Sequence, residues 1–158
     1  MSGPSVAERL AELGIELPAV AAPAGAYVPA VVHEHLVFTA GQIPFVDGAL
    51  PATGKVGSGD GLVDPEEAKA LARVCALNAL AAVADAIGSL DRVTRIVKLT
   101  GFVASSSGFT GQPGVINGAS ELLGDVFGEA GRHARSAVGV AELPLGAPVE
   151  VELVVAFA

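Results

Sequence analysis

Residues 131–140 read Gly-Arg-His-Ala-Arg-Ser-Ala-Val-Gly-Val, a strand-like run that places Arg135 among small and apolar residues. A second run of this kind follows at 149–157, after a turn that contains Pro144 and Gly146. Burying a guanidinium in such a strand is costly unless its charge is paired. Two explanations of Arg135 therefore stay open. Either a carboxylate holds it as a brace within the sheet, or it is kept to receive an anionic ligand, whose carboxylate fits the planar guanidinium fork.

The acidic residues of the second run bear on this choice. Glu150 and Glu152 are two residues apart and therefore share one face of a strand. If the two runs pair as antiparallel strands, that face brings a glutamate close to Arg135. Spacing alone gives the two explanations equal weight.

The rest of the chain alternates between strand-like and helix-like patterns. Five runs have the composition or alternation of β-strands: 28–32, 36–40, 93–103, 134–141 and 149–157. Two longer runs have helical spacing, from Asp64 to about Ile87 and around 115–126. The order β-β-α-β-α-β-β predicts an α/β (α+β, two-layer) fold in which two helices pack on one mixed sheet, as a single domain of residues 1–158. Residues 1–25 add a short helix at 5–13 and a Pro/Ala/Gly-rich arm.

Three local features refine this prediction. Asp64 can cap the start of the long helix, and Gly88 ends it. In the run 93–103, alternation places Val97 and Leu99 on the same face. Residues 45–61 are rich in glycine and proline and predict a long ordered loop that could include a short strand.

Composition and charge exclude several classes of function. The chain carries 17 acidic and 9 basic residues, a formal net charge of −8, which repels nucleic acid. Tyr27 is the single tyrosine and tryptophan is absent, so an aromatic platform for stacking bases is not expected. The pattern predicts neither a signal peptide nor a membrane span, and the lone Cys75 excludes an intrachain disulfide. We therefore expect a cytoplasmic protein, and a charged fraction of only 16% hints at apolar surface buried between subunits.

Other polar clusters give weaker indications of chemistry. His33 and His35 would point the same way from a strand, but no third ligand is spaced to help them, so solvated residues at a hairpin tip are expected and no metal site is predicted. The run 57–61 is rich in glycine but lacks the lysine and hydroxyl residue of a phosphate-binding loop. His133 could act as a base for Ser136, although nothing in the spacing orders such a pair.

The chain resembles the Rid (reactive intermediate deaminase), or YjgF-like, family across residues 26–157. The matching blocks agree in order and spacing: Ala26-Tyr27-Val28, Phe38-Thr39-Ala40-Gly41-Gln42-Ile43-Pro44, Val115-Ile116-Asn117 and Ala134-Arg135-Ser136-Ala137-Val138, the last continuing through Leu143-Pro144 to Val149-Glu150-Val151-Glu152. The resemblance implies a chorismate-mutase-like fold that assembles as a homotrimer with clefts between neighbouring subunits. It also implies hydrolysis of amino-acid-derived enamines and imines, such as 2-aminoacrylate, to a 2-keto acid and ammonia, with no metal or organic cofactor.

The same resemblance implies roles for individual residues. Arg135 matches the arginine that grips the substrate carboxylate, and Glu150 matches the acidic residue that positions or activates the attacking water. Tyr27 and Asn117 match polar residues of the cleft. Gly41 lies where the backbone comes close to the ligand and a small residue is required.

Some positions depart from the family pattern. Ala137 stands where many of the deaminases carry a cysteine, at a position whose implied role in substrate binding is largely through its backbone. Gly139 replaces a residue that is often acidic. The N-terminal helix and the longer 45–61 loop indicate a divergent branch, in which the loop could reshape the cleft and the range of substrates.

Three functions are compatible with these residues. The first is an imine/enamine deaminase. The second is a non-catalytic sensor or binding protein for a small carboxylate, which would use the same cleft. The third is an RNA-directed role, since relatives have been labelled endoribonucleases or translation inhibitors, and the acidic net charge counts against it.

Overall fold

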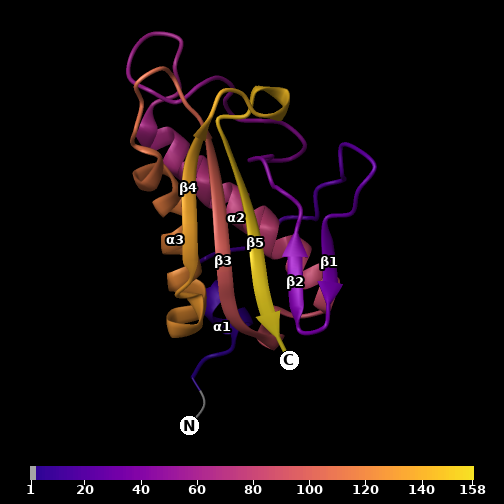
Figure 1. Cartoon of the computed structure of the whole chain (residues 1–158). Helices are drawn as coiled ribbons and strands as arrows, with labels where there is room; N and C mark the ends of the chain where they lie inside the picture. Colours follow the sequence, from indigo (N-terminus) through magenta and orange to yellow (C-terminus); the bar gives the residue numbers. More distant parts are fainter. Residues whose placement is uncertain (1–2) are drawn as a thin grey trace.

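The computed structural model describes residues 3–158 as one mixed sheet with helices on one of its faces (Figure 1). The strands are β1 (Ala30–His33), β2 (Leu36–Thr39), β3 (Val93–Ala104), β4 (Ala134–Val140) and β5 (Val149–Phe157). The α-helices are α1 (Val6–Glu12), α2 (Pro65–Ile87) and α3 (Gln112–Phe127), and the short 3-10 helices are η1 (Leu90–Arg92), η2 (Gly128–Gly131) and η3 (Pro144–Gly146). The predicted β-β-α-β-α-β-β order is confirmed.

The order of strands in the sheet is β1-β2-β5-β3-β4. Strand β5 pairs antiparallel with both β2 and β3, whereas β3 and β4 run parallel. Strands β4 and β5 therefore do not pair, because β3 lies between them. The expectation that antiparallel pairing of these two strands would bring a glutamate to Arg135 is wrong.

Helix α2 is the central element of the layer behind the sheet. The side chain of Asp64 accepts a hydrogen bond from the backbone N–H of Glu66 at 2.9 Å and caps its start, and Gly88 ends it with a φ of 89°. By length and composition α2 could cross a membrane, but 61% of its most apolar window is buried within the protein. Cys75 on this helix is fully buried, and burial raises the pKa of its thiol. The thiol is thus part of the core.

Alternation along β5 defines the two faces of the sheet. Val149, Val151, Leu153 and Val155 are buried against the helices, so Glu150, Glu152 and Val154 face the other way. In β3 this alternation is broken by register shifts against β5 between Val93 and Arg95 and between Ile96 and Lys98. As a result Val97 is exposed while Leu99 is buried, which corrects the prediction that they share a face.

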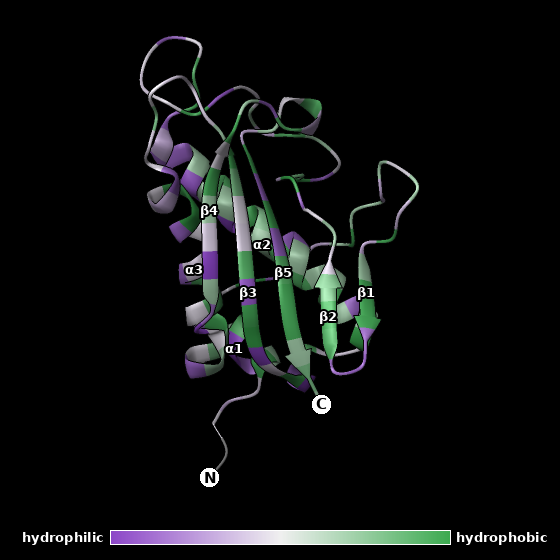
Figure 2. Cartoon of the chain, in the orientation of Figure 1, coloured by the Kyte–Doolittle hydropathy of each residue, from purple (hydrophilic) through white to green (hydrophobic). Residues whose placement is uncertain are grey.

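The face of the sheet opposite the helices is uncovered and partly apolar. Phe38 on β2 lies between Val31 of β1 and Val154 of β5, and Val138 lies on β4. Phe38, Val31 and Val138 are 43%, 52% and 44% exposed. Strands β1, β2 and β5 are coloured mainly hydrophobic in Figure 2. Apolar patches of this kind mark contact surfaces.

The loop 45–61 is ordered, and it contains no strand. Val46 and Ala49 form an isolated bridge across the turn at Asp47-Gly48, and Val56 bridges to Val63 and Ser105. These bridges tie the loop to the ends of α2 and β3. The short strand that the sequence analysis allowed here is absent, and isolated bridges are found in its place.

Candidate functional site

Arg135 lies on the edge strand β4 and reaches helix α3. It pairs with the buried Leu99 of β3, so its side chain projects on the helix side of the sheet. Nη1 donates to Oδ1 of Asn117 at 2.8 Å and to Oγ of Ser120 at 3.2 Å, and Nη2 donates to the carbonyl oxygen of Pro113 at 3.3 Å. Residues 113, 117 and 120 are four and three positions apart, and therefore present these acceptors on one face of α3.

The acceptors hold the guanidinium without neutralising it. All three are uncharged, and none of the four ion pairs within residues 3–158 involves Arg135. Nε–H and one N–H of Nη2 have no acceptor among the described residues, so two donors of the guanidinium remain unpaired. A carboxylate accepts such hydrogen bonds through its two oxygens. The explanation of Arg135 as a brace paired with a carboxylate is therefore wrong within this chain. The other explanation stays open, because the guanidinium has unpaired donors that can bind an anionic ligand.

His133 belongs to the surroundings of Arg135. Its Nε2 lies 2.9 Å from Oγ of Ser120, and its Nδ1 lies 2.6 Å from the carbonyl oxygen of Gly131. Ser136, by contrast, accepts a hydrogen bond from Nζ of Lys98 at 3.3 Å. Because His133 and Ser136 have these other partners, the idea of a His133–Ser136 pair is wrong. Spacing could not reveal the contact of His133 with Ser120, which lies thirteen positions away on α3.

Three other predicted site residues meet in a cavity of about 210 Å³ beside β5: Tyr27, Gly41 and Glu150. The rest of its lining is mainly apolar and includes Pro29, Ile43, Phe45 and Leu145. The hydroxyl oxygen of Tyr27 accepts a hydrogen bond from the backbone N–H of Ala24 at 3.2 Å, so its proton stays free to be donated. The cavity thus combines an apolar wall with a carboxylate and a hydroxyl donor.

Gly41 is required by its closeness to Glu150. A Cβ at position 41 would overlap the Glu150 carboxylate. The flanking residue Gln42 pairs with Val151 through two backbone hydrogen bonds of 2.8 and 3.0 Å, which fix this approach. The predicted need for a small residue at Gly41 thus has a physical cause in the packing of the glutamate.

The carboxyl group of Glu150 lies in surroundings that disfavour its charged form. Burial raises the pKa of its carboxyl group, and the negative charge of Glu152, two residues away on the same face, raises it further. A carboxylate with a raised pKa takes a proton from water more readily than an ordinary one. Glu150 can therefore activate a water molecule in the cavity.

Asn117 and Ala137 lie on the Arg135 side. Asn117 accepts a hydrogen bond from Arg135, as described. Ala137 lies two residues after Arg135 on the same face of β4 and is partly buried against the core. Gly139 comes next on that face, where a Cβ would lie 2.8 Å from Nε2 of Gln112 and 2.9 Å from Oγ of Ser105. Gln112 and Ser105 are hydrogen-bonded to each other there at 3.1 Å, so a side chain at position 139 would have to displace them.

The predicted site residues therefore form two groups. Arg135, Asn117 and Ala137 lie at the β4 edge on the helix side of the sheet. Tyr27, Gly41 and Glu150 line the cavity at β5. Each group holds a different charged side chain, the guanidinium of Arg135 or the carboxylate of Glu150.

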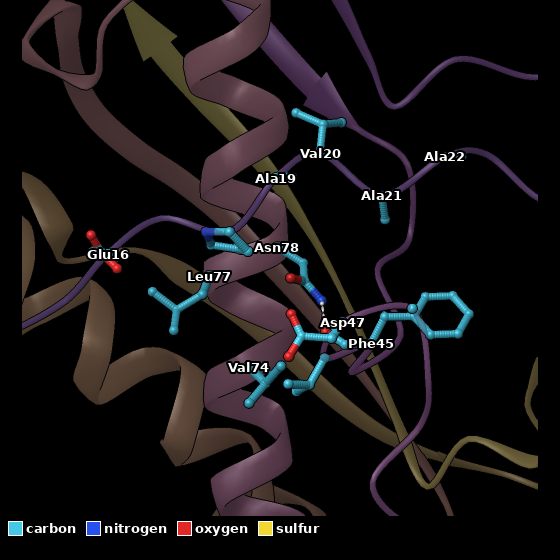
Figure 3. A pocket seen from close by; sticks show the side chains of 13 residues that line it. Glu16, Ala19, Val20, Ala21, Ala22, Phe45, Asp47, Val74, Leu77 and Asn78 are labelled. Atoms are coloured by element: carbon cyan, nitrogen blue, oxygen red, sulfur yellow. Dashed lines mark hydrogen bonds between the residues drawn. The ribbon is translucent and has the colours of Figure 1, made fainter.

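A larger cavity, of about 610 Å³, lies between the N-terminal arm, the turn at 45–48 and helix α2 (Figure 3). It holds none of the predicted site residues. Asn78, which is almost fully buried, donates from Nδ2 to the carbonyl oxygens of Ile43 and Phe45 at 3.2 Å each. Since Phe45 also lines the smaller cavity, Asn78 braces a wall shared by the two. Asn78 lies fourteen positions beyond the helix cap Asp64 and belongs to no motif, so the sequence did not indicate this role.

His33 and His35 are both exposed around the tight turn of the β1–β2 hairpin, as expected for solvated residues. Within residues 3–158 no group of three metal-ligating side chains comes together.

Comparison with known proteins places this geometry among relatives. Residues 7–157 match the family model described as "YjgF/chorismate mutase-like, putative endoribonuclease". Protein TCP17 of Trypanosoma cruzi is 50% identical over 151 residues, covering 95% of this chain and 92% of the relative. A structure from Shewanella oneidensis with the same endoribonuclease description is 34% identical, with a TM-score of 0.92, covering 98% of this chain and all of the other. TdcF of E. coli, solved with bound serine, is 29% identical with a TM-score of 0.62, covering 89% of this chain and 94% of TdcF.

Proposed function

The chain belongs to the YjgF/chorismate-mutase-like family, and from this premise we propose that it hydrolyses reactive imines and enamines of amino-acid origin to 2-keto acids and ammonia in the cytoplasm. The observation that carries the proposal is the guanidinium of Arg135, which is fixed by three uncharged acceptors and keeps two of its five N–H donors unpaired among the described residues. Such a group suits a substrate that bears a carboxylate. The bound serine of TdcF, itself a carboxylate-bearing amino acid, is consistent with this substrate class.

We further propose that the protein acts as a homotrimer in which the group around Arg135 of one subunit meets the Glu150 cavity of the next. Within one chain, Arg135 and the Glu150 cavity open on different parts of the molecule. The uncovered apolar face around Phe38 and Val138 supplies surface that association would bury. Arg135 of one subunit would then face Tyr27 and Glu150 of its neighbour.

The reaction needs only these groups. Arg135 holds the carboxylate and so orients the imine carbon toward the water beside Glu150. Glu150 accepts a proton from water as the water oxygen adds to the imine carbon, and it passes that proton to the imine nitrogen, which gives a neutral carbinolamine. Glu150 then moves the hydroxyl proton of the carbinolamine to the amine, the C–N bond breaks with its electron pair going to nitrogen, and ammonia leaves a 2-keto acid. An enamine first takes a proton on carbon to become the imine.

A coupled assay tests the proposal. 2-Aminoacrylate is generated in situ and pyruvate release is followed above the spontaneous rate, with wild type and Arg135→Ala compared at equal concentration. Wild type should accelerate pyruvate release and the variant should not, while its oligomeric state is unchanged. Equal rates for the two proteins would refute the assignment of Arg135.

The assay also separates the alternatives. Pyruvate binding without acceleration would identify a carboxylate sensor instead of an enzyme. Cleavage of RNA without effect on imines would support the endoribonuclease description of the family. The net charge of −8 makes such a nuclease the weaker candidate.

A further inference from the structure

Arg135 stands at the end of a chain of hydrogen bonds that begins at a backbone carbonyl. Nδ1 of His133 lies 2.6 Å from the carbonyl oxygen of Gly131, and Nε2 of the same ring lies 2.9 Å from Oγ of Ser120. Oγ of Ser120 accepts from Nη1 of Arg135 at 3.2 Å. The family resemblance assigned no role to His133 or Ser120.

Each link sets the direction of the next. A carbonyl oxygen only accepts, so Nδ1 carries a proton, and in the neutral form of the imidazole Nε2 then presents its lone pair. The single hydroxyl proton of Ser120 is then donated to Nε2. Its oxygen lone pairs are left for Arg135, which only donates.

We propose that His133 and Ser120 are positioning residues that fix the Arg135 guanidinium for carboxylate binding, an inference that rests on the proposed function. Neither residue contacts the substrate. Without Nε2 as acceptor, the hydroxyl of Ser120 turns freely, and Nη1 keeps only Asn117 as a fixed partner. The unpaired donors of the guanidinium are then held less firmly, and binding of a carboxylate through both of its oxygens is weakened.

Three variants and one control test this chain of hydrogen bonds. Ser120→Ala removes the acceptor for Arg135. His133→Asn keeps an amide N–H that can reach the carbonyl of Gly131, but removes the link to Ser120. The third is the double variant, and the control is Ser120→Thr, which keeps the hydroxyl.

Either single variant should raise KM for the imine about tenfold, the size expected for one hydrogen bond to a charged group. kcat should change little, because the carboxylate keeps its charge throughout the reaction and its binding is uniform. Pyruvate affinity, measured by calorimetry, should fall by the same factor. The double variant should be no worse than Ser120→Ala, because His133 acts through Ser120.

A structural role alone predicts a different pattern. It would lower the thermal midpoint of unfolding, reduce the active fraction and leave KM and pyruvate affinity unchanged. Single variants with wild-type KM and affinity, or additive losses in the double variant, would overturn the proposal. If His133→Asn does not fold, Ser120→Ala still tests the same prediction, because it breaks the chain of hydrogen bonds at the next link. If the wild-type protein neither hydrolyses imines nor binds pyruvate, the proposed function itself is wrong.

Discussion

Arg135 and Glu150 project from opposite faces of the same sheet, with strand β3 between their strands. Arg135 is paired with the buried Leu99 on the helix side, whereas Glu150 lies between the buried Val149 and Val151 and points the other way. A pair of residues placed like this cannot act on one small molecule within a single chain. The proposed reaction therefore depends on a second copy of the chain.

Arg135→Lys tests whether the fork of the guanidinium matters. An ammonium cannot donate to the three acceptors on α3 and also present two further donors to a carboxylate. KM for the imine should rise about 100-fold, with little recovery compared with Arg135→Ala. Steady-state kinetics of both variants measure this. Near-wild-type KM in Arg135→Lys would show that charge alone suffices.

Gly41→Ala tests the close approach to Glu150. The added Cβ would overlap the carboxylate, so the glutamate must move from its place in the cavity. Because the overlap is with the end of a flexible side chain, stability should fall only slightly, whereas imine hydrolysis should be strongly reduced. Urea unfolding and the coupled assay measure the two effects.

Gly114→Ala is the matched control, because a Cβ at Gly114 in helix α3 meets nothing within 4 Å. Its activity should be that of wild type and its stability equal or slightly higher. Equal behaviour of the two alanine variants would show that Gly41 has no special contact.

Glu152→Gln tests the cause of the raised pKa at Glu150. A base must be deprotonated, so the activity of wild type should fall on the acidic side as pH drops through the raised pKa of Glu150. Removing the negative charge of Glu152 makes Glu150 easier to ionise and lowers its pKa. The acidic limb of the kcat/KM profile should therefore move to lower pH. A limb that stays in place, or moves up, would contradict this account of the charge interaction.

Val138→Asp tests the apolar face as the contact between subunits. A charge there would be buried without a partner on association, so the variant should dissociate and lose activity. Sedimentation measures the change. Val32→Asp is the control: Val32 is similarly exposed, at 45%, but pairs with the buried Val37 and so lies toward the other face. Dissociation by the control alone would place the contact elsewhere.

The sequence predicted the elements of this fold well and their pairing poorly. Alternation along residues 149–157 and the cap at Asp64 are local signals, and both are present in the structure. The insertion of β3 between β4 and β5 is not local, because periodicity carries no record of which strands become neighbours. The same limit explains Val97, whose side is set by register shifts against β5.

The candidate site divides in the same way. Matching motifs named Arg135, Asn117, Tyr27, Gly41 and Glu150, and the structure brings the first two and the last three together. His133 was assigned to a near neighbour in sequence, Ser136, whereas its partner is Ser120 on a helix that folds back over the strand. Contacts that depend on packing between distant elements are the ones a pattern does not reveal.

Mixing two inactive variants gives the most direct test of a site shared between subunits. Arg135→Ala and Glu150→Gln are unfolded together in equal amounts, refolded, and assayed for imine hydrolysis. Random assembly pairs an intact Arg135 with an intact Glu150 at about one quarter of the interfaces, so activity should return to about that fraction of wild type. A mixture as inactive as its two components, although the subunits have exchanged, would contradict the shared site.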